Sequence, residues 1–136
     1  MDKAQLRKLL NAANEVRLKA YAPYSDYHVG CAILLRNSTI ITGANIENAS
    51  FGATICAERS ALSTVVSAGL QKDIQALAIV TQSSPVAAPC GICRQVLSEF
   101  LSYDAPIILA NDQGESTITS IGNLLPMAFS NKALIK

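Results

Sequence analysis

The chain has 136 residues, half of them hydrophobic and 15% charged, and its formal net charge is +1. This length suits a single domain, residues 1–136, that builds its own core. Long nucleic acids are excluded as partners because lysine and arginine are scattered, and a membrane is excluded because no apolar run approaches the roughly 20 residues that span a bilayer.

The first predicted element is an amphipathic helix over residues 3–20, where leucine, alanine and valine recur at helical spacing between charged residues. This N-terminus has no apolar signal core, so we expect a cytoplasmic protein whose thiols stay reduced. Pro23 ends the helical pattern. Two strands follow at 28–35 and 39–46, and the polar turn RNS between them indicates a hairpin.

The rest of the chain predicts further helices and buried strands. A helix over 56–68 should end at Gly69, because glycine readily adopts the left-handed cap conformation. The remaining predicted elements are a strand at 74–80, a helix at 93–101, a strand at 106–111 and a short helix within 118–129 that ends at Pro126. This order predicts an α/β domain with one mixed sheet that helices cover on both faces.

The four cysteines are candidates for metal binding or catalysis, because disulfides are rare in a reducing compartment. Cys90 and Cys93 are three residues apart and so share one face at the start of a helix. The positive end of the helix dipole favours thiolates there. Taken alone, this pair is equally consistent with half a zinc site, a redox couple or two small buried residues.

Cys56 begins the helix over 56–68 and is followed by Glu58. Catalytic zinc sites use three protein ligands and leave the fourth position to water. Cys56 would complete such a set with Cys90 and Cys93 if the two helix N-termini face each other. Glu58 is about 200° from Cys56 around an ideal helix. The two side chains can therefore converge only beyond the helix end, where the carboxylate could act as general base and then acid.

These segments resemble a known family. The C-A-E triplet followed by P-C-x-x-C resembles the three-cysteine signature of the zinc nucleoside and nucleobase deaminases. The segments YAPYSDYHVG, GANIENAS, CAERSAL, PCGICRQVL and LLPMAF resemble, in order, the small homotetrameric cytidine deaminases. The resemblance implies a three-layer α/β/α sandwich with a mixed five-stranded sheet, and one Zn²⁺ per chain.

The activity that the resemblance implies is a hydrolase reaction on a cyclic amidine C–N bond. Cytidine and deoxycytidine would be converted to uridine and deoxyuridine with release of ammonia, a step of pyrimidine salvage. Glu58 would be the catalytic proton shuttle, and Cys56, Cys90 and Cys93 the zinc ligands. Arg59, three residues after Cys56, would offset the negative charge of three thiolates on one ion.

The resemblance also implies how a nucleoside would be bound. Asn45 and Glu47 alternate along an extended segment, so both point the same way and would hold the ribose hydroxyls. Tyr27, often phenylalanine in the family, would pack against the base, although its hydroxyl then needs a partner. The main-chain N–H of Ala57 would complete base recognition. Phe129 would reach into the site of a neighbouring subunit of a homotetramer.

Three alternatives remain open from the sequence. A blasticidin-type deaminase shares the zinc signature, although NIENA and YAPYS favour a pyrimidine nucleoside. A non-catalytic structural zinc module would use Cys31 as a fourth ligand, whereas its place in the middle of a strand predicts core packing. A thiol–disulfide protein would cycle Cys90 and Cys93 and would leave Glu58 and Arg59 without a role.

Overall fold

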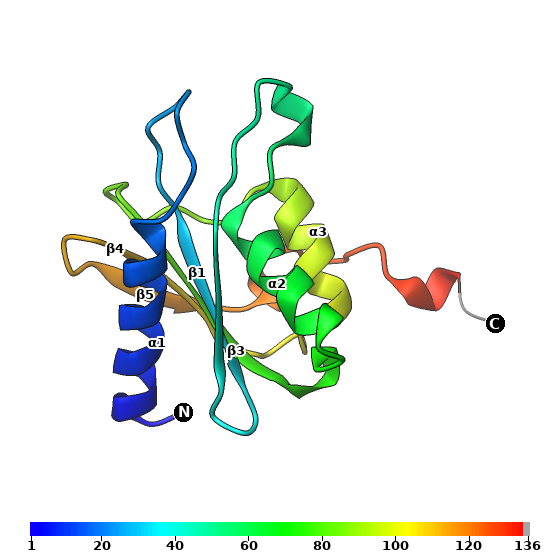
Figure 1. The fold of residues 1–136 in the computed structure, drawn as a ribbon. Coiled ribbons are helices and arrows are strands. Elements are labelled where there is room, and N and C mark those ends of the chain that lie inside the picture. Colours follow the sequence, from blue (N-terminus) through cyan, green and yellow to red (C-terminus); the bar gives the residue numbers. More distant parts are fainter. Residues whose placement is uncertain (135–136) are drawn as a thin grey trace.

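The computed structural model describes residues 1–134, so residues 135–136 of the predicted domain lie outside the described residues. Within this range one mixed sheet runs in the order β2-β1-β3-β4-β5 (Figure 1). Strands β3 and β4 pair parallel, and the other neighbouring strands pair antiparallel. The strands are β1 (Gly30–Leu35), β2 (Ile40–Ala44), β3 (Ile74–Thr81), β4 (Ile107–Asn111) and β5 (Ser116–Thr119).

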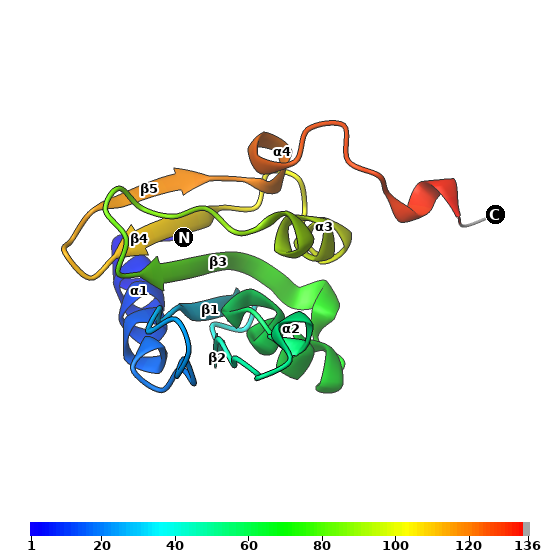
Figure 2. The ribbon, with the colours of Figure 1, turned by 90° about the horizontal axis from the view of Figure 1, so that it is seen from above.

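Helices cover both faces of this sheet, which confirms the three-layer α/β/α prediction (Figure 2). The helices are α1 (Lys3–Arg17), α2 (Ala57–Ser67), α3 (Gly91–Phe100) and α4 (Ile121–Leu124). Successive residues of β1 alternate between the two cores, so Ala32 and Leu34 pack towards α1, while Cys31 and Ile33 pack towards α2 and α3. In the described residues no helix is long and apolar enough to cross a membrane.

Glycine at one position sets how closely α2 can approach the sheet. A Cβ atom on Gly43 of β2 would lie 2.3 Å from the main-chain nitrogen of Ala61 in α2. Real Cβ atoms do not come so near to backbone, so only glycine permits this contact. The middle of α2 is thereby held against the edge strand β2, and Cys56 is the N-cap residue of the same helix.

The predicted element bounds differ from the structure by one or two residues at most ends, and by more at two places. The first helix ends at Arg17 rather than at residue 20. The segment 118–129 was expected to be helical, but its first residues belong to β5, and only α4 is helical. Pairing with β4 and the alternation of Ser and Thr with Ile explain the strand, since these residues suit a half-exposed edge. Gly69 ends α2 with a positive φ of 75°, as predicted.

Candidate metal centre and active site

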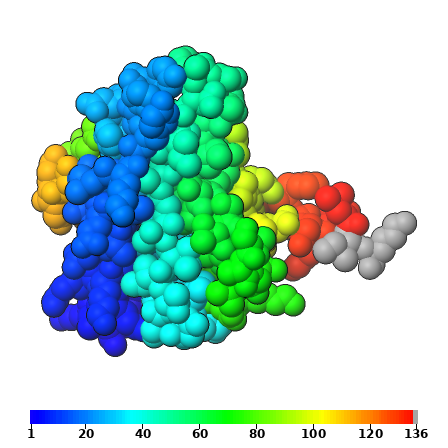
Figure 3. Space-filling view, in the orientation of Figure 1, coloured from blue at the N-terminus to red at the C-terminus, as the bar shows by residue number. Residues whose placement is uncertain are grey.

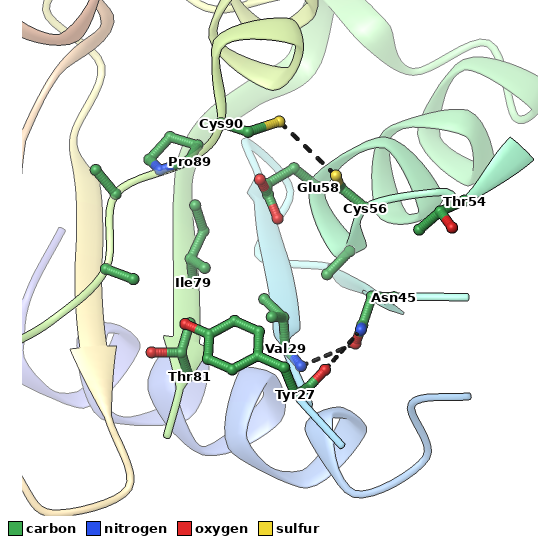
Figure 4. A pocket seen from close by; sticks show the side chains of 13 residues that line it. Tyr27, Val29, Asn45, Thr54, Cys56, Glu58, Ile79, Thr81, Pro89 and Cys90 are labelled. Atoms are coloured by element: carbon green, nitrogen blue, oxygen red, sulfur yellow. Dashed lines mark hydrogen bonds between the residues drawn. The ribbon is translucent and has the colours of Figure 1, made fainter. Parts of the chain in front are cut away.

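Three thiols meet where α2 and α3 begin. Cys56 is the N-cap residue of α2, Cys90 is the N-cap residue of α3, and Cys93 lies in the first turn of α3. Their sulfur atoms all lie within 4.8 Å of one another. The Sγ atoms of Cys56 and Cys90 are 3.8 Å apart (Figure 4). Two sulfurs bound tetrahedrally to one zinc at about 2.3 Å would be about 3.8 Å apart, so the spacing fits a zinc ion.

The charge distribution around the thiols also fits a cation. Hydrogen bonds from Cys93 and then from Arg59 lower the pKa of Cys56 to about 5. The pKa of Cys93 is raised because its thiol donates a hydrogen bond to the sulfur of Cys56 and because it is buried. The lowered pKa of Cys56 favours its thiolate form, which is the form that binds zinc.

Arg59 lies beside this cluster. One of its terminal nitrogens is 3.7 Å from the Sγ of Cys56 and donates to the carbonyl of Thr54 at 3.3 Å. Its Nε is buried and has no hydrogen-bond partner among the described residues. A partly buried guanidinium whose Nε has no partner, beside the thiol cluster, suits a cluster that carries net negative charge.

Glu58 adds a carboxyl group to the same place. It lies in the first turn of α2, is 4% exposed, and lines a cavity of about 230 Å³ together with Cys56 and Cys90. Figure 4 shows its carboxyl group pointing into this cavity beside the sulfur atoms. Burial raises the pKa of Glu58, and a buried acid beside a metal site is a group suited to proton transfer near neutral pH.

Tyr27, Asn45 and Ala57, which the sequence assigned to substrate binding, line the same cavity. The Oη of Tyr27 lies 2.5 Å from the Oγ of Ser83, so the hydroxyl has a partner and the ring is held in place. The amide of Asn45 accepts from the N–H of Val29 at 2.8 Å and donates to the carbonyl of Tyr27 at 2.8 Å. One amide hydrogen and further acceptor capacity of Asn45 remain for a ligand.

Glu47 does not line the cavity of the thiols. It borders a second cavity of about 280 Å³ with Phe51 and Thr54, and Thr54 borders both. The carboxylate accepts from the main-chain N–H of Tyr24 at 2.9 Å and from the hydroxyl and N–H of Ser25. The hydroxyl of Ser25 is the main cause of the lowered pKa of Glu47. The side chain is therefore ionised and fixed in one orientation.

Two further residues lie away from the cavity. Phe129 is 62% exposed on the segment that follows α4, and its carbonyl accepts from Gln95. Cys31 is fully buried in the core between the sheet and the α2–α3 layer, as predicted. Burial raises the pKa of Cys31, and it is not one of the three thiols that lie together. A four-cysteine cage is therefore not formed.

Several contacts at the site could not be read from the sequence. Ser83 and Ser25 hold Tyr27 and Glu47, and Thr81 and Pro89 line the cavity. These residues come from loops or strand ends that meet only in the folded chain. The sequence indicated that the hydroxyl of Tyr27 needs a hydrogen-bond partner. It did not indicate that Ser83 is this partner.

The fold is a mixed sheet covered by helices, and three thiols and a buried carboxyl meet where two helices begin. These features define a zinc-binding α/β domain. Residues 3–108 match the family model described as the cytidine and deoxycytidylate deaminase zinc-binding region. The chain belongs to this family, and Cys56, Cys90 and Cys93 form a cluster suited to its zinc.

Known proteins share both the sequence and the fold. A cytidine deaminase from Halalkalibacterium halodurans is 43% identical over 122 residues, which are 90% of this chain and 92% of the relative. The crystal structure of cytidine deaminase from Burkholderia pseudomallei has a TM-score of 0.89 and 42% identity, with 95% of this chain and 100% of that chain covered. A blasticidin-S deaminase from Bacillus cereus is 33% identical over 119 residues, 79% of this chain and 81% of the relative.

Proposed function

We propose that the protein is a zinc-dependent hydrolase that converts cytidine and deoxycytidine to uridine and deoxyuridine with release of ammonia. The observation that carries this proposal is the buried carboxyl of Glu58 in the cavity that the thiols of Cys56 and Cys90 also line. The cytidine deaminases of Halalkalibacterium halodurans and Burkholderia pseudomallei, which match over nine tenths of this chain or more, support it.

When bound, zinc supplies Lewis acidity that lets a water lose its proton near neutral pH. Glu58 would accept that proton and pass it to ring N3 of the base, and would then deliver a proton to the departing ammonia. In the balanced reaction a bond from oxygen to C4 forms, the bond from C4 to the exocyclic nitrogen breaks, and one water is consumed. Arg59 would stabilise the thiolates and so keep the metal site acidic.

The substrate would be held by groups that surround the cavity. The ring of Tyr27 would pack on the base, the N–H of Ala57 would bind it, and the remaining amide hydrogen of Asn45 would reach the ribose. Glu47, which borders the neighbouring cavity, would accept from the 3′-hydroxyl. The cavity of about 230 Å³ has a size that suits a small molecule.

We also propose that four copies assemble, with Phe129 of one subunit entering the site of another. Phe129, Met127 and Phe51 are large apolar side chains exposed on the chain, and such groups mark contact surfaces. Size-exclusion chromatography with light scattering should then give a molar mass four times the chain mass of 14.4 kDa. We place the enzyme in the cytoplasm, where the thiols stay reduced and available for zinc.

The direct test of the activity is an assay of cytidine loss, with and without a zinc chelator, run in parallel with blasticidin S. Cytidine and deoxycytidine should be consumed, the chelator should stop the reaction, and added zinc should restore it. Turnover of blasticidin S with none of cytidine would instead support the blasticidin-type alternative. No turnover of either substrate by protein that holds zinc would disprove the proposal.

A further inference from the structure

Arg94 binds two main-chain carbonyls from different parts of the chain. It lies in α3 directly after Cys93, and its Nε donates to the carbonyl of Pro89 at 2.8 Å. One of its terminal nitrogens donates to the carbonyl of Leu124 at 2.9 Å. Both bonds are partly buried, and hydrogen bonds from a charged donor in such surroundings are among the stronger ones.

The first carbonyl belongs to the turn that presents a thiol. Pro89 is buried, precedes Cys90, and lines the cavity. The main-chain N–H of Arg94 also donates to the carbonyl of Cys90 at 3.0 Å. Side chain and backbone of one residue therefore hold Pro89 and Cys90 together. The Cys90 side chain makes no capping hydrogen bond in α3, so the bonds from Arg94 hold the main chain from which the Cys90 thiol projects.

The second carbonyl belongs to the last residue of α4. The residues that follow, 125–134, are here called the C-terminal segment, and they extend away from the sheet and helices (Figures 1 and 3). Gln95, the neighbour of Arg94, donates from Nε2 to the carbonyl of Phe129 at 3.0 Å. Two consecutive side chains of α3 thus hold Leu124, which directly precedes the C-terminal segment, and Phe129 in the middle of that segment.

We propose that Arg94 is a positioning residue that couples the placement of the zinc ligand Cys90 to the placement of the C-terminal segment. The proposal rests on the proposed zinc enzyme, because it gives Cys90 its role as a ligand. Only arginine suits the position, since its planar fork can donate in two directions at once, whereas a lysine ammonium reaches one of the two carbonyls. Loss of the Arg94 side chain would therefore disturb both the metal site and the residue at which the C-terminal segment begins.

The test compares four variants of the zinc-loaded protein. Arg94→Met removes both bonds, Arg94→Lys keeps a charge that can reach one carbonyl, and Gln95→Leu removes only the bond to Phe129. Arg7→Met is the matched control, because Arg7 is an exposed arginine of α1. Zinc release is followed with a coloured chelator, and the mobility of the C-terminal segment is followed as the rate of trypsin cleavage after Lys132, which is exposed.

Arg94→Met should release zinc about 10- to 100-fold faster, as expected for loss of a group that supports a metal ligand. It should also be cleaved faster after Lys132. Gln95→Leu should be cleaved faster while its zinc release stays that of the wild type, and Arg7→Met should match the wild type in both. If Arg94→Met is unfolded, Arg94→Lys serves in its place and should release zinc faster than the wild type.

Zinc release at the wild-type rate in both Arg94 variants would overturn the proposal. Faster release with unchanged cleavage would overturn the coupling. Cytidine turnover by the wild type is measured separately and tests the proposed deaminase activity. Failure of that activity is therefore distinguishable from failure of the positioning role of Arg94. In the two Arg94 variants kcat should fall more than KM rises, because a displaced Cys90 alters the metal site rather than the ribose contacts.

Discussion

Replacement of Glu58 by glutamine removes one ionisable group and little else. The carboxyl is 4% exposed and shares its cavity with Cys56 and Cys90. Burial raises the pKa of Glu58 towards neutral pH. A residue that both accepts and donates protons is most effective when its pKa is near the working pH. Glutamine has nearly the same size and shape, so the thiols, the zinc and the cavity should be unchanged.

The expected loss follows from the number of proton transfers. Catalysis by one acid–base group contributes about 10²- to 10⁴-fold. Glu58 would take part in every proton transfer of the reaction, so we expect a loss near the upper end. A fall in kcat of about 10⁴-fold corresponds to about 5.4 kcal/mol of transition-state stabilisation. The change is measured from initial rates of cytidine loss, with zinc content determined on the same sample.

Glu99→Gln is the matched control, because Glu99 is exposed on α3 and lies outside the cavity. It should retain the wild-type kcat. The Glu58 variant should still bind one zinc per chain and still bind nucleoside. A zinc-loaded Glu58→Gln protein with kcat within about threefold of the wild type, far less than one acid–base group contributes, would refute the assignment of Glu58 as proton shuttle.

Three further changes test other parts of the account. Arg59→Ala should keep zinc but lower kcat about tenfold or more, because it removes the guanidinium next to the thiolates; unchanged kinetics would contradict this role. Gly43→Ala should lower the free energy of unfolding by about 1–3 kcal/mol because the added Cβ pushes α2 off the sheet. Gly52→Ala, which adds a Cβ with nothing within 4 Å, is its control in thermal melts, and equal melting of the two variants would disprove the contact. Glu47→Gln should lower Tm at neutral pH, since the hydrogen bond from Ser25 lowers the pKa of Glu47 and its carboxylate stabilises the fold above the unfolded-state pKa of about 4.3. That contribution is lost as the pH falls through the lower folded-state pKa, so the difference in Tm from the wild type should narrow in acid, and a difference that does not depend on pH would contradict the lowered pKa.

The pairing of Cys90 with Cys93 was predictable because it is local, whereas the addition of Cys56 and the role of all three as zinc ligands rested on the resemblance to the deaminase family. Two cysteines three residues apart at a helix start must share a face, and a cysteine that begins another helix must lie at that helix end. The structure places Cys56, Cys90 and Cys93 together in this way. Continuous apolar runs likewise identified β3 and β4, and Gly69 marked the end of α2. In these cases the physical cause lies within a few residues of sequence.

The surroundings of the predicted substrate-binding residues were less predictable, because they depend on contacts between residues far apart in the sequence. Alternation along an extended segment placed Asn45 and Glu47 on one side, yet the two residues border different cavities. Ser25, far from Glu47 in sequence, decides how that carboxylate is held. The edge strand β5 is short and exposed, so it carries no apolar run, and its pairing with β4 is what makes it a strand. Contacts of this kind become visible only after folding.

X-ray absorption at the zinc edge of the purified protein measures the central feature directly. The account predicts one zinc per chain with three sulfur neighbours at about 2.3 Å and one oxygen or nitrogen neighbour at about 2.0–2.2 Å. That pattern would show the three thiols of Cys56, Cys90 and Cys93 holding a metal with one position left for water. Four sulfur neighbours, which would require Cys31, or protein purified without zinc would contradict the account.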